Sequence, residues 1–261
     1  VRNYELECLR RDDSSVWLLE NSVLMDDPET GREVVVGTVI DITRRKKLER
    51  ELERMAYHDS LTGLPNRRLL REHAGQVLAM ADRGGHKLGL VYLDLARFKD
   101  VNDTLGHDAG DEVLRVVARR LDTHLRESDM ASRVGGDEFA VLVSEVSGPE
   151  GAMAAASRLR RIFREPIAVK GDERRLDARL GVALYPDHAT DFDSLLTAAD
   201  HAMYRVRSET REGVGLYDPG SGPHRGSSAG EPGEGDDPPR RGTEPDADRP
   251  GDGPDGTPPG G

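Results

Sequence analysis

Residues 132–145 read Ser-Arg-Val-Gly-Gly-Asp-Glu-Phe-Ala-Val-Leu-Val-Ser-Glu, and this stretch decides the fold. Two adjacent glycines followed by an apolar run are typical of a tight β-hairpin. We expect the chain to turn at Gly135 and Gly136, because glycine adopts positive φ angles without steric cost. The hairpin would carry Asp137 and Glu138 at its tip, and the two glycines would let a phosphate approach the backbone closely.

A second acid stands at the end of a predicted buried strand. Residues 88–95 form an apolar run that only Asp94 interrupts. Asp94, Asp137 and Glu138 together could hold Mg²⁺, which proteins usually bind through one or two carboxylates plus phosphate oxygens of the substrate. Taken singly, each acid is better explained as an ordinary solvated residue of a turn.

The chain around these acids alternates between helical and extended patterns from residue 58 onward. Apolar spacing predicts helices over residues 69–80, 109–125, 149–164 and 192–207. A second hairpin is predicted over residues 167–185, with its turn near Gly171 and Asp172. This order of elements predicts an α+β domain with helices packed on a sheet.

The first 43 residues have a different pattern, rich in β-branched and aromatic residues. Strands are expected near residues 6–9, 16–23 and 34–42, with turn signals between them. Three strands without a helix are too few to enclose a hydrophobic core.

Residues 44–57 are predicted to form a linker helix that Thr43 caps. Leu48, Leu52 and Met55 recur at spacings of four and three, which places them on one seam with charged residues around it. We favour a short parallel coiled coil over an amphipathic helix that lies on its own domain, because the helix joins two distinct parts of the chain.

The end of the chain, residues 219–261, is predicted to be a disordered acidic tail. It holds ten prolines and twelve glycines, and nine acidic residues against four arginines. Such a segment buries too little apolar surface to offset its ordering entropy.

The overall charge and the apolar runs limit the classes of partner. The net charge of −12 argues against nucleic acid and anionic membrane surfaces, although a nucleotide substrate needs only local positive groups. No apolar run approaches the roughly 18 residues of a membrane helix, so no membrane insertion is expected. The single Cys8 fits a reducing compartment, and the start has no signal-peptide pattern, so we expect a cytoplasmic protein.

Three motifs in order resemble one family. They are Asp59-x-Leu-Thr-Gly-Leu-Pro-Asn-Arg67, then Asp94-x-x-x-Phe-Lys-x-x-Asn-Asp-x-x-Gly-His-x-x-Gly-Asp111, then Gly135-Gly-Asp-Glu-Phe139. On these motifs, residues 58–218 are identified as a member of the GGDEF-domain diguanylate cyclase family. Residues 1–43 resemble the C-terminal part of a PAS/PAC sensory domain, on the hairpin at 11–17 and the closing segment at 36–43.

The resemblance implies a fold and a metal site. The fold would be the palm of nucleotidyl cyclases and polymerases, a mostly antiparallel central sheet with surrounding helices. Asp94, Asp137 and the carbonyl of Leu95 would bind two Mg²⁺ or Mn²⁺ ions in each half-site. Glu138 would act either as the base or as a residue that positions a metal.

The resemblance also implies that the substrate is GTP. The amides of Phe98 and Lys99, with the Lys99 ammonium, would hold its β- and γ-phosphates. Asn102 and Asp111 would read guanine, because a carboxylate accepts from guanine N1–H and N2–H and would stay unpaired with adenine. His107 lies near this site in the family, and a purely structural hydrogen bond is an equal alternative for it.

The reaction implied is the condensation of two GTP molecules into cyclic di-GMP with release of two pyrophosphates. Each domain would bind one GTP, so a homodimer is required, which gives the linker seam a purpose. Arg126-Glu-Ser-Asp129 matches the family's RxxD site, where the product binds as an inhibitor; a surface ion pair is the alternative for Arg126 and Asp129.

Three departures from the family pattern bear on this expectation. Ala96 replaces an acid, which we expect to weaken tuning of the metal site without abolishing it. Arg207 replaces a lysine and keeps its charge, and Thr210 replaces a glycine before the retained Arg211, so phosphate contacts are expected from Arg207 and Arg211. The alternative functions are a GGDEF module that only senses GTP or cyclic di-GMP, and an inactive fragment. No EAL phosphodiesterase motif follows within this chain.

Overall fold

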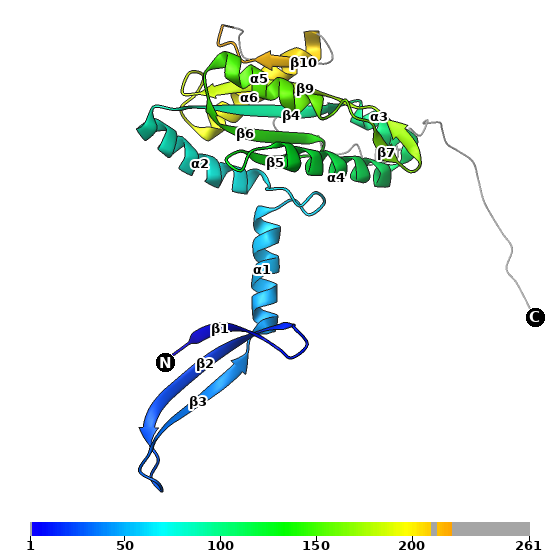
Figure 1. Ribbon diagram of the computed structural model, residues 1–261. Coiled ribbons are helices and arrows are strands. Elements are labelled where there is room, and N and C mark those ends of the chain that lie inside the picture. The colour runs from blue at the N-terminus through cyan, green and yellow to red at the C-terminus, as the bar shows by residue number, and fades with distance from the viewer. Residues whose placement is uncertain (1, 210–212, 221–261) are drawn as a thin grey trace, which may run out of the picture. The chain divides into compact units, whose positions relative to one another are not determined.

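The computed structural model describes residues 2–209 and 213–220 (Figure 1). The predicted tail lies outside the described residues except for Pro219 and Gly220. None of the described helices combines the length and the apolar character that crossing a membrane requires.

The N-terminal part forms an antiparallel sheet in the order β1-β2-β3, which confirms the three predicted strands. Its strands are β1 (Tyr4–Leu9), β2 (Ser15–Asp26) and β3 (Glu33–Asp41). Large apolar side chains on this sheet, such as Val35 and Val39, are exposed. The sheet therefore encloses no hydrophobic core of its own, as its size predicts.

Helix α1 (Thr43–Tyr57) follows, and the prediction that Thr43 caps it is wrong. Thr43 is the first helical residue, and its Oγ1 accepts a hydrogen bond of 2.9 Å from the Trp17 amide. The Asp41 carboxylate accepts from the Thr43 amide instead, at 2.9 Å. The threonine hydroxyl thus ties the helix start to β2 and does not cap the free amides of the first turn.

The central sheet has five strands in the order β10-β9-β4-β6-β5, all antiparallel except for the β9–β10 pair. The strands are β4 (Lys87–Ala96), β5 (Met130–Gly135), β6 (Glu138–Val146), β9 (Asp177–Tyr185) and β10 (Gly213–Leu216). β4 lies in the middle and is buried on both faces, as its continuous apolar run predicts. The observed architecture is the predicted α+β fold.

Helices cover both faces of this sheet (Figure 1). Residues of α4 (His107–His124) and α5 (Pro149–Arg161) share one core with it, and residues of α2 (Arg67–Gly84) and α6 (Phe192–Glu209) share the other. α6 approaches β9 so closely that a Cβ at Gly181 would lie 2.0 Å from the Ala199 carbonyl oxygen. Only glycine at position 181 permits this contact.

Further details differ from the sequence-based expectation. α3 (Phe98–Leu105) was not predicted, since it is short and mostly polar. The second hairpin is only β7 (Ile167–Val169) and β8 (Asp172–Arg174), and β9 leaves it to pair with β4. α5 ends at Arg161, before the predicted residue 164. The apolar pattern of residues 177–185 could not tell a hairpin arm from a central strand.

Candidate active site

The sheet register brings the predicted acids to one end of β4. Asp94 pairs with Glu138 on β6 and with Arg179 on β9. Side chains directly opposite each other share a face of the sheet, so these three lie together on the face that α2 and α6 cover. Two residues earlier on β4, Tyr92 lies on the same face.

Asp94 is 7% exposed and has an arginine partner. Arg179 Nη1 donates to its Oδ2 over 2.6 Å. Burial raises the pKa of Asp94 and the nearby Asp137 carboxyl adds to the rise, while Arg179 and Arg207 oppose it, which leaves the pKa at about 6.

Glu138 is held by a tyrosine. The Tyr92 hydroxyl donates to Glu138 Oε2 over 3.0 Å. Burial raises the pKa of Glu138; the Tyr92 hydrogen bond opposes the rise, and Asp200 on α6 and Asp137 contribute to it. Burial also raises the pKa of Asp200. Several carboxylates therefore share one partly buried space, which favours binding of a cation.

The Arg133 side chain holds the turn of the hairpin that carries Asp137. Gly135 pairs with Glu138, so Gly136 and Asp137 make the turn, one residue later than predicted, and Gly136 has φ 48°. The Arg133 guanidinium donates to the Gly136 carbonyl at 2.9 and 2.7 Å. The same guanidinium donates to both oxygens of Asp59 at 2.9 and 3.1 Å. The first motif thus fixes the turn of the third.

The start of α3 offers backbone amides beside the end of β4. Arg97 precedes the helix in the left-handed region with φ 64°. Phe98 is buried as the first helical residue, and Lys99 is exposed beside it. Free amides at a helix N-terminus favour a bound anion, and the lysine adds positive charge. Leu95 is buried one residue after Asp94, opposite Ala178.

Asn102 and Gly110 are in close contact between α3 and α4. The Asn102 Oδ1 is buried without a hydrogen-bond partner among the described residues. A Cβ at Gly110 would lie 2.0 Å from that oxygen. Asp111, one residue on, has a side chain that is 46% exposed and lies 3.8 Å from Arg115. His107 is exposed as the first residue of α4.

Of the other predicted residues, Arg207 lies near the acids, whereas Arg126 and Asp129 lie at the far end of the hairpin. Arg207 is exposed in the last turn of α6, and its charge lowers the pKa of Asp94 and of Glu138. Arg211 lies outside the described residues. Arg126 and Asp129 lie just before β5, at the opposite end of the hairpin from Asp137.

The Asp129 carboxylate also holds two nearby backbone amides. Its carboxylate accepts from the Ser144 amide at 3.0 Å and from the Arg126 amide at 3.4 Å. Its Oδ1 therefore helps to hold β6 in place. The Arg126 side chain is exposed, and within the part of the chain that the structure describes it forms no ion pair with Asp129.

The donor set fits a metal that arrives with a phosphate ligand. Within the described ranges, no group of three or more His, Cys, Asp or Glu side chains is arranged to hold a metal ion. Two crowded carboxylates, Asp94 and Asp137, are nevertheless what Mg²⁺ needs when substrate phosphates supply its other ligands. Ala96, which lies on the same face of β4, adds no third carboxylate.

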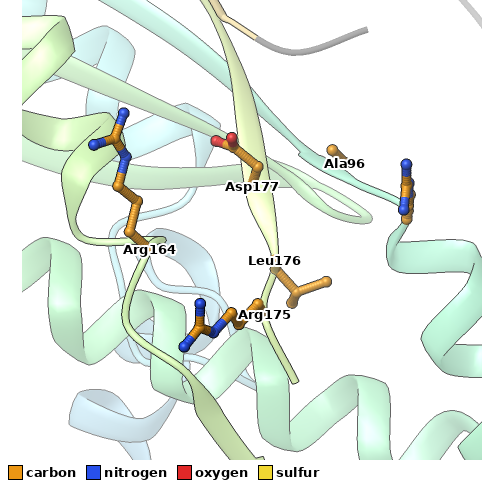
Figure 2. A pocket seen from close by; sticks show the side chains of 6 residues that line it. Ala96, Arg164, Arg175, Leu176 and Asp177 are labelled. Carbon is orange, nitrogen blue, oxygen red and sulfur yellow. The ribbon is translucent and has the colours of Figure 1, made fainter. Parts of the chain in front are cut away.

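A pocket of about 330 Å³ opens beside the end of β4. Figure 2 shows Ala96 at the end of β4, Arg164 on the turn after α5, and Arg175 to Asp177 on the segment that enters β9. Arg97 completes the lining. The Asp177 carboxylate is already paired with Arg160, at 2.9 and 2.5 Å, so arginines dominate the charge of this pocket.

Three residues of the site were missed from the sequence. Tyr92 had a usable signal, because it stands two residues before Asp94 and must share its face of the strand. Arg179 and Asp200 had none, since their place beside the acids depends on the register of β9 and on the packing of α6.

Comparison with known proteins gives a consistent result for this part of the chain. The family model described as "Diguanylate cyclase, GGDEF domain" matches residues 56–213. The chain is similar to the diguanylate cyclase TpbB of Pseudomonas aeruginosa, with 40% identity over 161 residues that cover 61% of this chain and 37% of TpbB. It is also similar to the cyclic di-GMP phosphodiesterase NbdA of that organism, with 39% identity over 166 residues, 64% of this chain and 21% of NbdA.

Solved structures agree. The crystal structure of the GGDEF domain of TpbB matches with a TM-score of 0.59 and 37% identity, over 60% of this chain and 98% of that one. The coiled coil and GGDEF domain of DgcB from Caulobacter crescentus, in complex with c-di-GMP, matches with a TM-score of 0.60 and 26% identity, over 67% of this chain and 93% of that one.

Proposed function

The chain belongs to the GGDEF diguanylate cyclase family, and we propose that it joins two GTP molecules into cyclic di-GMP. The observation that carries this proposal is the convergence of Asp94, Asp137 and Glu138 at one end of β4, beside the start of α3. The chain covers little more than a third of TpbB, so the activity of a whole relative is not transferred with the match.

We propose the following division of the chain. Residues 58–218 form the catalytic domain, residues 44–57 the linker helix, and residues 1–43 a partial PAS/PAC domain. The N-terminal part consists of a separate three-stranded sheet, which has large apolar side chains exposed, and one helix, and this supports the division. A cytoplasmic location is supported by the lone free Cys8.

In the proposed reaction, the 3′-hydroxyl of each GTP attacks the α-phosphorus of the other. Two phosphodiester bonds form, two phosphoanhydride bonds break, two pyrophosphates leave, and the hydroxyl protons pass to a base or to water. Asp94, Asp137 and the Leu95 carbonyl would hold Mg²⁺ or Mn²⁺, two ions per half-site, which when bound neutralise the triphosphate and acidify the attacking hydroxyl. Positioning and charge stabilisation supply most of the catalysis.

Glu138 is suited to receive a proton. The pKa of Glu138 is raised toward neutral pH, and a general base is most effective when its pKa lies near the working pH. The Tyr92 hydroxyl holds one of its oxygens and leaves the other for the substrate. This favours the base over the alternative role of positioning a metal.

Asn102 and Asp111 are proposed to select guanine. The Asn102 oxygen faces Gly110, so its amide NH₂ is the end that remains to donate to guanine acceptors. The half-exposed Asp111 carboxylate can accept from guanine N1–H and N2–H. His107, exposed at the start of α4, could contribute at the same end.

The phosphates are proposed to bind at the start of α3. The amides of Phe98 and Lys99 and the exposed Lys99 ammonium would hold them, with Arg207 and Arg211 as further cations. Gly135 and Gly136, both exposed, leave the turn open to a phosphate.

A half-site on each chain requires two chains. Leu48, Leu52 and Met55 on α1 are 51%, 63% and 59% exposed, and α1 has no buried residue. An apolar seam of this kind supports a parallel coiled coil that brings two domains together.

We also propose that the product, cyclic di-GMP, inhibits the reaction by binding at Arg126 and Asp129. The exposed Arg126 guanidinium could fork onto guanine or a phosphate of cyclic di-GMP, the ligand bound in the DgcB structure. Arg126→Ala should then lose inhibition by added cyclic di-GMP, whereas Arg119→Ala, at another exposed position before β5, should keep it. Unchanged inhibition in Arg126→Ala would reject the site.

A GGDEF module that binds nucleotide without catalysis is the second candidate. The observation that favours it is the Arg179–Asp94 ion pair, which neutralises one of the proposed metal ligands.

One experiment separates the two functions. Purified wild type is incubated with GTP and Mg²⁺ beside Asp137→Ala and the control Asp172→Ala, whose side chain is exposed on β8. A cyclase forms cyclic di-GMP in the wild type and the control and not in Asp137→Ala. If the wild type and the control bind GTP and none of the three proteins forms cyclic di-GMP, the result would favour the sensor.

A further inference from the structure

Arg179 places a fixed positive charge at the candidate metal site. Its guanidinium lies 2.6 Å from Asp94, and the two side chains are only 14% and 10% exposed. The register of β4 and β9 sets them directly opposite each other, so the contact is built into the sheet. Asp177, opposite Ala96 at the same end of the sheet, pairs with Arg160 instead.

A close, partly buried pair of this kind persists in the absence of other cations. An arginine stays protonated at any physiological pH, and removal of one partner of a buried pair leaves a costly unpaired charge. A divalent ion that approaches Asp94 must therefore share its carboxylate with Arg179 or displace it. Ala96, on the same face of the strand, supplies no further carboxylate to attract the ion.

We propose that Arg179 is the resident counter-ion of Asp94, so that the nucleotide-free protein binds divalent cations weakly at this site and the metal enters together with the phosphates of the nucleotide. The second step rests on the proposed function, because the nucleotide brings both phosphate ligands and the negative charge that outweighs the guanidinium. Arg179 is a positioning residue in this account: its hydrogen bond holds the Asp94 carboxylate in place before substrate binds.

The test is a titration of the nucleotide-free protein with Mn²⁺, followed by electron paramagnetic resonance. Arg179→Gln keeps a hydrogen-bond donor and removes the charge, and it should bind Mn²⁺ at least about tenfold more tightly than wild type. Arg179→Lys keeps the charge and should bind as weakly as wild type. The double variant Asp94→Asn with Arg179→Gln should lose the tight binding.

Arg160→Gln is the matched control. It also removes an arginine that pairs with an aspartate of β9, but the partner is Asp177 instead of Asp94, and the two side chains are 23% and 21% exposed. Its Mn²⁺ affinity should equal that of wild type. Mn²⁺ should also raise the melting temperature of Arg179→Gln more than that of wild type or of Arg160→Gln.

Equal Mn²⁺ affinity in wild type and in folded Arg179→Gln would overturn the proposal. If Arg179→Gln unfolds without metal, rescue of its folding by Mn²⁺ supports the proposal and failure of rescue overturns it. The readout uses neither GTP nor turnover. A negative result therefore leaves the cyclase proposal standing, and a failure to form cyclic di-GMP leaves the Mn²⁺ result standing.

Discussion

The Tyr92 hydroxyl donates a hydrogen bond of 3.0 Å to Glu138 Oε2, which links the middle of β4 to the first residue of β6. The bond fixes the orientation of a half-buried carboxylate at the tip of the hairpin. If Glu138 accepts the proton of the attacking hydroxyl, its orientation matters for turnover more than for binding.

Tyr92→Phe should therefore lower kcat, by about tenfold, with little change in KM for GTP, and should lower the free energy of unfolding by about 1 kcal/mol. Steady-state rates and urea unfolding measure the two effects. Tyr185→Phe is the control, because this tyrosine donates to Asp82 at 3.3 Å on the same face of the sheet. It should lose comparable stability and keep kcat. An equal loss of kcat in both variants would contradict the role of Tyr92.

Gly110→Ala tests the guanine site. The added Cβ would lie 2.0 Å from the Asn102 Oδ1 and 3.1 Å from the Phe98 ring, so the Asn102 amide must move. We expect GTP binding, measured by calorimetry, to weaken by about tenfold, or about 1.4 kcal/mol.

Gly75→Ala, at a helical glycine with open space around its Cβ position, is the matched control. It should keep GTP affinity and gain about 0.5–1 kcal/mol of stability from its higher helix propensity. Unchanged GTP affinity in a folded Gly110→Ala would remove Asn102 from the guanine site.

Asp59 predicts a pH dependence of stability. Burial alone would raise the pKa of Asp59, but hydrogen bonds from Thr62 and Arg133 outweigh burial and lower the pKa below its ordinary value of 3.8. The stability that this group contributes is present above the pKa of the unfolded chain and is lost as the pH falls through the lower folded pKa.

Asp59→Asn should therefore cost about 1.5–3 kcal/mol near pH 7, and this cost should shrink as the pH falls below about 4. Urea unfolding of wild type and variant at a series of pH values checks it. Asp172→Asn, with a side chain 63% exposed, should differ from wild type by no more than about 0.5 kcal/mol at any pH. A cost of Asp59→Asn that stays constant with pH would contradict the ionic origin.

Leu52→Lys tests the linker seam. The side chain is 63% exposed in the single chain, so the substitution should leave the fold intact and weaken self-association. Sedimentation should show more monomer, and the rate per chain should fall most at low protein concentration. Met80→Lys, 61% exposed on α2, should change neither. Unchanged dimerisation in Leu52→Lys would assign the contact to another surface.

The sequence predicted the elements that carry their own periodicity. The apolar run around Asp94 and the paired glycines before Asp137 predicted β4 and the β5–β6 hairpin, because both signals are local. The same patterns could not give the register that sets Asp94 opposite Glu138 and Arg179. That relationship depends on three segments far apart in the chain.

The errors have a similar cause. Thr43 has the side chain of a helix cap, but its hydroxyl accepts a hydrogen bond from the Trp17 amide of β2 instead. The residues of β9 alternate like those of a hairpin arm, and only long-range pairing draws them into the central sheet. α3 is too short for apolar periodicity to reveal it.

The most direct test of the central claim is the stoichiometry of products from GTP. Purified protein with Mg²⁺ is followed over time by chromatography for GTP and cyclic di-GMP and by a coupled assay for pyrophosphate, over a range of protein concentrations. We predict one cyclic di-GMP and two pyrophosphates for every two GTP consumed, with a rate per chain that rises with protein concentration. Bound but unconverted GTP at every concentration would contradict the account.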